Sequence, residues 1–285
     1  MKKIILLILL AITITGCGIK RDSMEDINIY TSVYPIEYIT QSLYDKNSTI
    51  KSIYPDGVIP EIYTINEKQI KDFSKGDLFI FNGLNNEKDY LKPMLSHNNN
   101  LKIIDATASM EFNYYNEELW LDPDNMLMIA RNIKSGFNEY INNHYLKNEI
   151  EKNYKNLKID LSNLSAKLRL TSSSTQDPTI VVSSDMFLFL KKYGYNVISL
   201  DEKTKTEKTI ADVKKRIENG TTKNIFILKG IETPETIKNI IEETNCETIE
   251  IHTLSTITEI ERTNKKDYIS IMTETINSLK QELYK

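Results

Sequence analysis

Two carboxylates and one imidazole follow predicted strands, where they could bind a divalent cation. Glu61 follows the second predicted strand through the loop PDGVIPEIY, Glu118 follows the fourth, and His252 ends the last. Ligands of open α/β sheets bind beyond the carboxyl ends of the strands, so we expect these side chains to face one cleft. Two desolvated carboxylates repel each other unless a cation lies between them. Such a set favours Mn²⁺, although Zn²⁺ also accepts carboxylate oxygen and histidine nitrogen.

Two further polar residues end the first predicted strand of the second half of the chain. Ser184 is a poor metal ligand because a neutral hydroxyl offers little charge, but it could hold a water on the ion. Asp185 could replace it, although we expect this carboxylate to cap the helix that follows.

The segment NEELWLDPDN (116–125) contains the only tryptophan of the chain. We expect Glu118 to face the ligand and Trp120 to pack beneath the cleft. Tyr34, Tyr63 and Trp120 could form an apolar shell that limits water around the ligand, with ordinary core packing as the competing expectation for each.

The elements that must position these residues alternate between strands and helices, the pattern of α/β proteins with parallel sheets. The expected strands are 27–33, 49–54, 77–83, 101–106, 179–184, 195–200, 224–229 and 247–253. The expected shorter helices are 36–44, 66–74, 86–95, 186–193, 208–218, 234–244 and 264–284. Between the halves, apolar residues recur every three to five positions over about 141–170, which predicts a long amphipathic helix.

The predicted fold class is therefore α/β, with two lobes of mainly parallel sheets joined by a single long helix and a ligand cleft between the lobes. The expected segments are a lipoprotein signal peptide (1–16), a lipid-anchored tether (17–26), an N-terminal α/β lobe (27–140), the linking helix (141–172) and a C-terminal α/β lobe (173–285).

The first residues predict a secreted, lipid-anchored protein. Two lysines precede an apolar stretch (4–14) that is too short to span a bilayer but fits a signal peptide. The sequence Ile-Thr-Gly-Cys that follows is typical of a lipidation site at Cys17. The only other cysteine is Cys246, so acylation of Cys17 leaves no intramolecular disulfide.

The charge of the mature chain argues against a nucleic-acid partner. Removal of the two signal-peptide lysines leaves 34 basic and 40 acidic side chains, a formal charge of −6. No cluster of basic residues offers a surface for nucleic acid.

Four stretches resemble a known family in order and spacing: YTSVYPIEYI (30–39), DLFIFNGLNNEKDYL (77–91), ELWLDPDN (118–125) and SSDMFLFLKKYGYNVISL (183–200). They are similar to the zinc/manganese solute-binding lipoproteins of bacterial ABC transporters, a metal-binding receptor family also described as surface adhesins. The resemblance implies an extracytoplasmic receptor, lipid-anchored at the cell membrane. It would act as a monomer that delivers a divalent cation to a permease driven by a separate ATPase subunit.

The expected metal ligands depart from that family. Its usual ligand positions hold Glu61, Glu118, Ser184 and His252 here, so its histidines are missing and a histidine stands where an aspartate is usual. A degenerate receptor is thus an open alternative, in which protonated His252 between the two glutamates needs no metal and the protein is a binding or interaction lipoprotein.

Catalysis is not expected. No Gly-x-Ser-x-Gly motif surrounds Ser184, and the sequence has no Gly-rich phosphate-binding loop.

Overall fold

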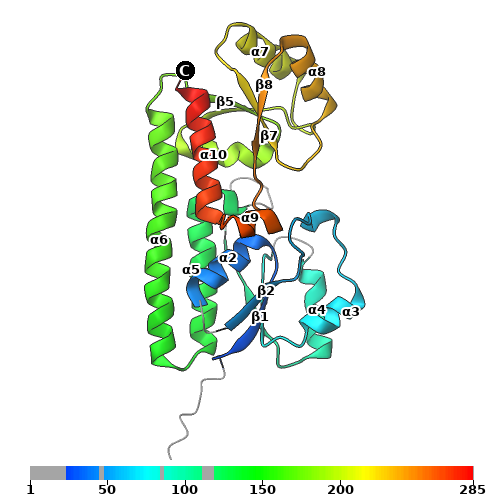
Figure 1. Cartoon of the computed structure of the whole chain (residues 1–285), viewed down its shortest axis with the longest axis vertical. Coiled ribbons are helices and arrows are strands. Elements are labelled where there is room, and N and C mark those ends of the chain that lie inside the picture. Colours follow the sequence, from blue (N-terminus) through cyan, green and yellow to red (C-terminus); the bar gives the residue numbers. More distant parts are fainter. Residues whose placement is uncertain (1–23, 45–47, 84–86, 111–118, 285) are drawn as a thin grey trace, which may run out of the picture.

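The computed structural model describes residues 24–44, 48–83, 87–110 and 119–284. The predictions for Cys17 and Glu118 therefore lie outside the described residues. The described chain forms two α/β lobes, one above the other, along which a single long helix runs (Figure 1).

The first lobe contains a four-stranded sheet in the order β2-β1-β3-β4. Its strands are β1 (Ile27–Thr31), β2 (Ser48–Ser52), β3 (Leu78–Phe81) and β4 (Lys102–Asp105), and every neighbouring pair is parallel. The central strand β3 has the sequence LFIF and is buried throughout, as expected of a strand covered on both faces.

The second lobe repeats this arrangement in the order β6-β5-β7-β8. Its parallel strands are β5 (Thr179–Val182), β6 (Asn196–Ser199), β7 (Asn224–Leu228) and β8 (Glu247–Ile251). Seven of the eight expected strand segments contain an observed strand, and β2 begins one residue before the expected segment 49–54. The predicted α/β class with parallel sheets is confirmed.

The helices of the first lobe are α2 (Tyr34–Tyr44), α3 (Glu67–Phe73), α4 (Glu87–His97) and α5 (Pro123–Tyr140). The sequence sets the start of α5: the Asp122 side chain accepts a hydrogen bond from the Asp124 N–H, and Pro123 occupies the first turn.

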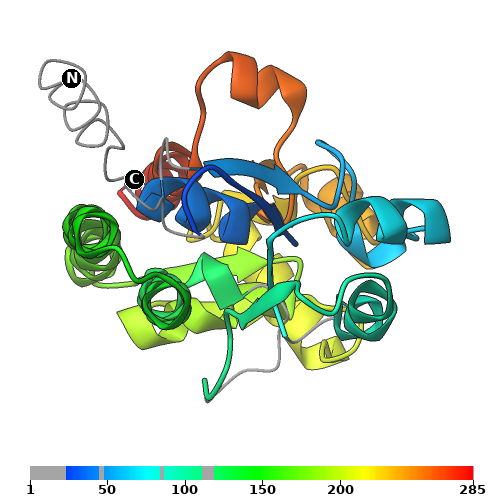
Figure 2. The same cartoon turned by 90° about the horizontal axis from the view of Figure 1, so that it is seen from below.

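The long helix is α6 (His144–Ser173), which the Asn143 side chain caps. Its buried face includes Leu146, Leu157 and Leu168, and it packs against α5, α2 and the C-terminal helix α10 (Tyr268–Leu283). Seen along the long axis of the molecule, α5 and α6 lie side by side at one edge (Figure 2). Among the described residues, no helix is both long enough and apolar enough to cross a bilayer.

The remaining helices of the second half are η4 (Asp185–Tyr193), α7 (Glu207–Glu218), α8 (Glu235–Thr244) and α9 (Glu259–Thr263). Two of them differ from expectation. The segment 186–193 is a 3₁₀ helix rather than an α-helix, and α9 is an additional short helix between the last strand and α10.

The chain between β8 and α10 lies against the first lobe, although it belongs to the second half of the sequence. The Tyr34 N–H donates to the Ser255 carbonyl at 3.2 Å, and the Gly57 N–H donates to the Ile257 carbonyl at 2.8 Å. One large core cluster includes residues of both halves, while a smaller cluster, which contains the buried thiol Cys246, belongs to the second lobe alone. The two lobes are therefore joined by hydrogen bonds and by a shared hydrophobic core.

Candidate functional site

A cavity of about 430 Å³ is lined by loops from both halves of the chain. Glu61 reaches it from the loop after β2, and His252 reaches it from the residue directly after β8. Met186 and Ile231 line it from the segments that follow β5 and β7. The cavity thus lies at the carboxyl ends of strands from both sheets, where α/β proteins bind ligands.

The short 3₁₀ helix η2 (Pro60–Ile62) presents Glu61 to this cavity. Pro60 is buried at the start of the turn, which leaves the next two side chains exposed. The Glu61 carboxylate therefore remains in contact with solvent as well as with the cavity.

Hydrogen bonds at both ring nitrogens hold His252 in one orientation. Its Nδ1 accepts the Leu254 N–H at 2.8 Å, and its Nε2 lies 3.3 Å and 3.4 Å from the two carboxylate oxygens of Glu261. The proton must then be on Nε2, since Nδ1 is an acceptor. Burial lowers the pKa of His252, which the neighbouring Glu261 carboxylate opposes only in part, so the ring is neutral at neutral pH.

Glu261 is a buried carboxylate that remains ionised. Burial by itself raises its pKa, but hydrogen bonds from Lys229 and Thr258 outweigh that effect and lower the pKa to about 2. Lys229 Nζ lies 2.6 Å from one carboxylate oxygen, while the N–H and hydroxyl of Thr258 donate to the other at 2.9 Å and 2.8 Å.

The donor set fits a cation in part. Metal-binding histidines usually donate their second ring N–H to a carboxylate, as His252 does to Glu261. The Nδ1 lone pair of His252 would face the ion only after giving up the Leu254 N–H. Within the described residues, no three His, Cys, Asp or Glu side chains already stand in metal-binding geometry.

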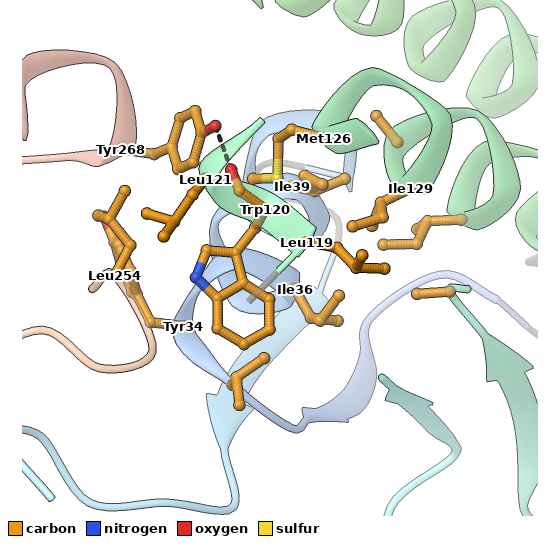
Figure 3. Close-up of a cluster of buried hydrophobic side chains, with 14 of the residues drawn as sticks. Tyr34, Ile36, Ile39, Leu119, Trp120, Leu121, Met126, Ile129, Leu254 and Tyr268 are labelled. Carbon is orange, nitrogen blue, oxygen red and sulfur yellow. Dashed lines mark hydrogen bonds between the residues drawn. The ribbon is translucent and has the colours of Figure 1, made fainter. Parts of the chain in front are cut away.

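Trp120, just beyond the undescribed Glu118, is a fully buried core residue rather than a wall of the cavity (Figure 3). Its indole N–H donates to the Thr253 carbonyl at 2.8 Å, and its own carbonyl accepts the Tyr268 hydroxyl at 2.5 Å. The segment after Glu118 is therefore fixed to the residue next to His252.

The two tyrosines expected near the ligand also have packing roles. Tyr34 is buried and lies in the same cluster as Trp120 (Figure 3), whereas the Tyr63 ring packs edge-on against Tyr54 and its hydroxyl accepts a hydrogen bond from Gln69. Neither tyrosine is among the residues that line the cavity.

The structure does not bring Ser184 and Asp185 to this cavity. The Ser184 hydroxyl accepts the Met186 N–H at 3.3 Å and caps η4. Asp185 accepts the Thr204 hydroxyl at 3.0 Å and lines a different cavity of about 580 Å³ beside β6 and α7. Met186, from the same turn, reaches the first cavity instead.

An ion-pair cluster between the halves is a feature that sequence reasoning missed. Arg262 on α9 binds Asp56 with two nitrogens, at 2.6 Å and 2.9 Å, and it binds the buried carboxylate of Glu37 at 2.7 Å. These partners are more than 200 residues apart in sequence, so no local pattern could reveal them.

Comparisons with known proteins agree with this architecture. The family model described as zinc-uptake complex component A, periplasmic, matches residues 29–282. A metal ABC transporter substrate-binding lipoprotein of Lactococcus lactis is 24% identical over 245 residues, which cover 77% of each chain. The lipoprotein SloC of Streptococcus mutans, which has the same description, is 24% identical over 219 residues, 70% of this chain and 71% of that one.

Solved structures share the fold. The Zn(II)-bound ZnuA-like domain of Streptococcus pneumoniae AdcA has a TM-score of 0.75 and 18% identity, with 91% of this chain and all of that one covered. The metal-dependent lipoprotein YcdH of Bacillus subtilis has a TM-score of 0.77 and 19% identity, with 90% and 99% covered.

The family match extends over nearly all of the described chain, and it confirms the resemblance seen in the four sequence motifs. The relatives named as substrate-binding lipoproteins agree with it. The chain therefore belongs to the zinc-uptake complex component A family, whose members are substrate-binding proteins of metal ABC transporters and not enzymes.

Proposed function

We propose that this chain is a lipid-anchored, extracytoplasmic receptor that captures a divalent cation, manganese or zinc, and delivers it to an ABC permease. A separate subunit would hydrolyse ATP. The observation that carries the proposal is that Glu61 and His252, from opposite halves of the chain, line one cavity at the carboxyl ends of both sheets.

Three side chains would bind the ion: Glu61, Glu118 and His252. The bond from Trp120 to the Thr253 carbonyl supports this set, because it ties the chain two residues beyond Glu118 to the neighbour of His252. Nδ1 of His252 would exchange the Leu254 N–H for the ion, while Glu261 keeps the proton on Nε2. Ser184 and Asp185 would cap and brace the turn after β5 rather than bind the ion.

The ligand types favour manganese over zinc. Two carboxylates and one imidazole form a harder set than the histidine-rich sites typical of zinc. Zinc remains a candidate cargo because it accepts both donor types and because a structural neighbour is described as Zn(II)-bound.

Membrane attachment would occur through Cys17, so the body of the protein would be held beside the permease by a short tether (18–26). The names of the relatives as lipoproteins support this location. One acyl-type anchor is consistent with a body that lies outside the bilayer.

A calorimetric titration with Mn²⁺ and Zn²⁺ tests the proposal. The full chain would be purified in detergent without chelator, and its metal content measured first. We expect saturable binding of one ion and a rise in melting temperature that grows with ion concentration. The absence of both heat and thermal shift for either ion would refute the metal receptor.

A second candidate is a receptor of the same fold with a metal-free cleft. It is favoured by the complete hydrogen bonding of His252, whose two ring nitrogens are satisfied without a cation. The same titration separates the two candidates, since a metal-free binding or interaction lipoprotein would give no response to either ion.

A further inference from the structure

The walls of the cavity that holds Glu61 and His252 are largely apolar. The aliphatic and thioether side chains that line it are Ile59, Ile62, Met186, Leu228 and Ile231. A bare hydrated ion gains no favourable contact from such a wall, because its own water shell faces the side chains. Pockets for small organic ligands, in contrast, combine mostly apolar walls with a few polar groups.

The size of the cavity agrees with an organic ligand. One water molecule takes up about 30 Å³ of liquid, so a volume of about 430 Å³ greatly exceeds the need of one ion with a few waters. It falls within the range of about 300–1,000 Å³ that is usual for small-molecule sites.

Two of these side chains lie in solvent on facing loops. Ile62 in η2 is 79% exposed, and Ile231 after β7 is 42% exposed. Single exposed aliphatic residues are common, but these two border one cavity from opposite halves of the chain. A ligand with an apolar part would remove both from water.

The polar groups favour a ligand that also contains a cation. Lys229 lines the cavity, but its ammonium group is paired with Glu261. The Glu61 carboxylate also lines the cavity and gives it an anionic group, and His252 adds an imidazole nitrogen.

We propose that the ion enters this cavity as a complex with a small organic chelator. The bound metal would face Glu61 and His252, while the apolar part of the chelator lies against Ile62, Met186 and Ile231. This inference rests on the proposed function, because it assumes that the transported cargo includes a divalent cation.

Two chelators with identical donor atoms test it. Iminodiacetate and N-benzyliminodiacetate both bind Zn²⁺ through one nitrogen and two carboxylates and leave positions free for protein ligands; only the second carries an apolar group. The full chain in detergent is titrated with Zn²⁺ alone and with each zinc complex. We expect the benzyl complex to bind about tenfold to a hundredfold more tightly than the iminodiacetate complex, from burial of one aromatic group.

A matched pair of variants locates the effect. Ile62→Asn is expected to remove most of the difference between the two complexes, because the side chain lines the cavity. Ile260→Asn is the control, since Ile260 is 73% exposed, similar to Ile62, and does not line the cavity. Both variants should melt at the same temperature as the unmodified chain, because neither side chain is part of the core.

Each outcome has a distinct meaning. Equal affinity for the two complexes, with Zn²⁺ alone bound and Ile62→Asn without effect, overturns the chelate inference but leaves the metal receptor intact. Binding of N-benzyliminodiacetate equally well without zinc overturns the inference, because the cation then adds nothing. A chain that binds no zinc species overturns the inference and the proposed function together.

Discussion

His252 and Glu61 line the same cavity from different halves of the chain, but their surroundings differ. His252 is fixed by Leu254 and Glu261, whereas Glu61 lies on an exposed turn. An ion that binds here therefore meets one donor in a preset tautomer and one on an exposed turn. Substitution of His252 would also remove the partner of the Leu254 N–H and of the Glu261 carboxylate. Substitution of Glu61 therefore tests metal binding more directly.

We expect Glu61→Gln to weaken Mn²⁺ or Zn²⁺ binding by roughly tenfold or more, because the neutral amide removes one of the charges that balance the ion. Asp185→Asn is the matched control, since Asp185 lines a different cavity. Calorimetry on both variants measures the change. Equal losses for the two would show that the ion reaches the turn after β5, contrary to the geometry.

The buried Glu261 should make stability depend on acid. Its pKa of about 2 lies below its usual 4.5, so its contribution is complete above about pH 4.5 and is lost as the pH falls toward 2. We expect Glu261→Gln to cost on the order of 2 kcal/mol at pH 6 and progressively less below pH 4. The pKa of His252 is also lowered, so protonation of its buried ring in acid likewise lowers the stability of the fold.

Denaturant unfolding at several pH values, with chelator present to remove metal, checks this dependence. Glu247→Gln serves as the control because Glu247 is exposed on β8. A difference between Glu261→Gln and the unmodified chain that stays constant from pH 6 to pH 3 would contradict the role of the ionised carboxylate.

Sequence reasoning placed Glu61 and His252 correctly in one cavity because parallel strands bring their carboxyl ends to one edge. The positions of Ser184 and Asp185 outside this cavity could not be predicted, because a position directly after a strand does not reveal which way the next turn directs its side chains. There Ser184 caps η4 and Met186 points to the cavity. The apolar lining, which comes from three separate segments, has no signature in any one of them.

At the scale of elements, the positions of strands such as β3 (LFIF) and β5 (TIVV) were predictable because each is a short, mainly apolar run bounded by polar turns. The helix α9 was not, since five residues are too few to show periodicity. A signal was nevertheless present: Thr258 and Glu261 form a capping box in which each side chain bonds the backbone of the other. That motif also positions the carboxylate beside His252.

The attachment of α9 to the first lobe should depend on Arg262. Arg262→Ala would remove the cationic partner of the buried Glu37 carboxylate, which would keep its hydrogen bond from the Gln41 amide, and would release Asp56. We expect a loss of about 2–3 kcal/mol in the free energy of unfolding, below the full cost of a buried pair because Arg262 is one-third exposed.

Arg169→Ala provides the comparison for this measurement. Arg169 is more exposed and lies 3.7 Å from Asp124, so its loss should cost under about 1 kcal/mol. Chemical unfolding of both variants gives the two values. Similar small losses would show that the contacts of Arg262 do not hold the halves together.

At the scale of the whole molecule, several bonds join the second half to the first: those of Trp120 to Thr253, Gly57 to Ile257, Tyr34 to Ser255, and Arg262 to its carboxylates. The helix α6 runs along both lobes and packs against α5 and α10 (Figure 1). This arrangement differs from two lobes on a flexible hinge, and it favours small rocking movements when a ligand binds.

Trp120 reports directly on such movement. It is the only tryptophan, it is fully buried, and it bonds the residue next to His252. If the lobes only rock, saturation with Mn²⁺ or Zn²⁺ should leave its emission maximum close to that of the metal-free chain. The unfolded chain in guanidinium gives the reference for an indole in water. A shift toward that reference on metal binding would mean that the Trp120–Thr253 contact opens, and the halves would then have to separate rather than rock.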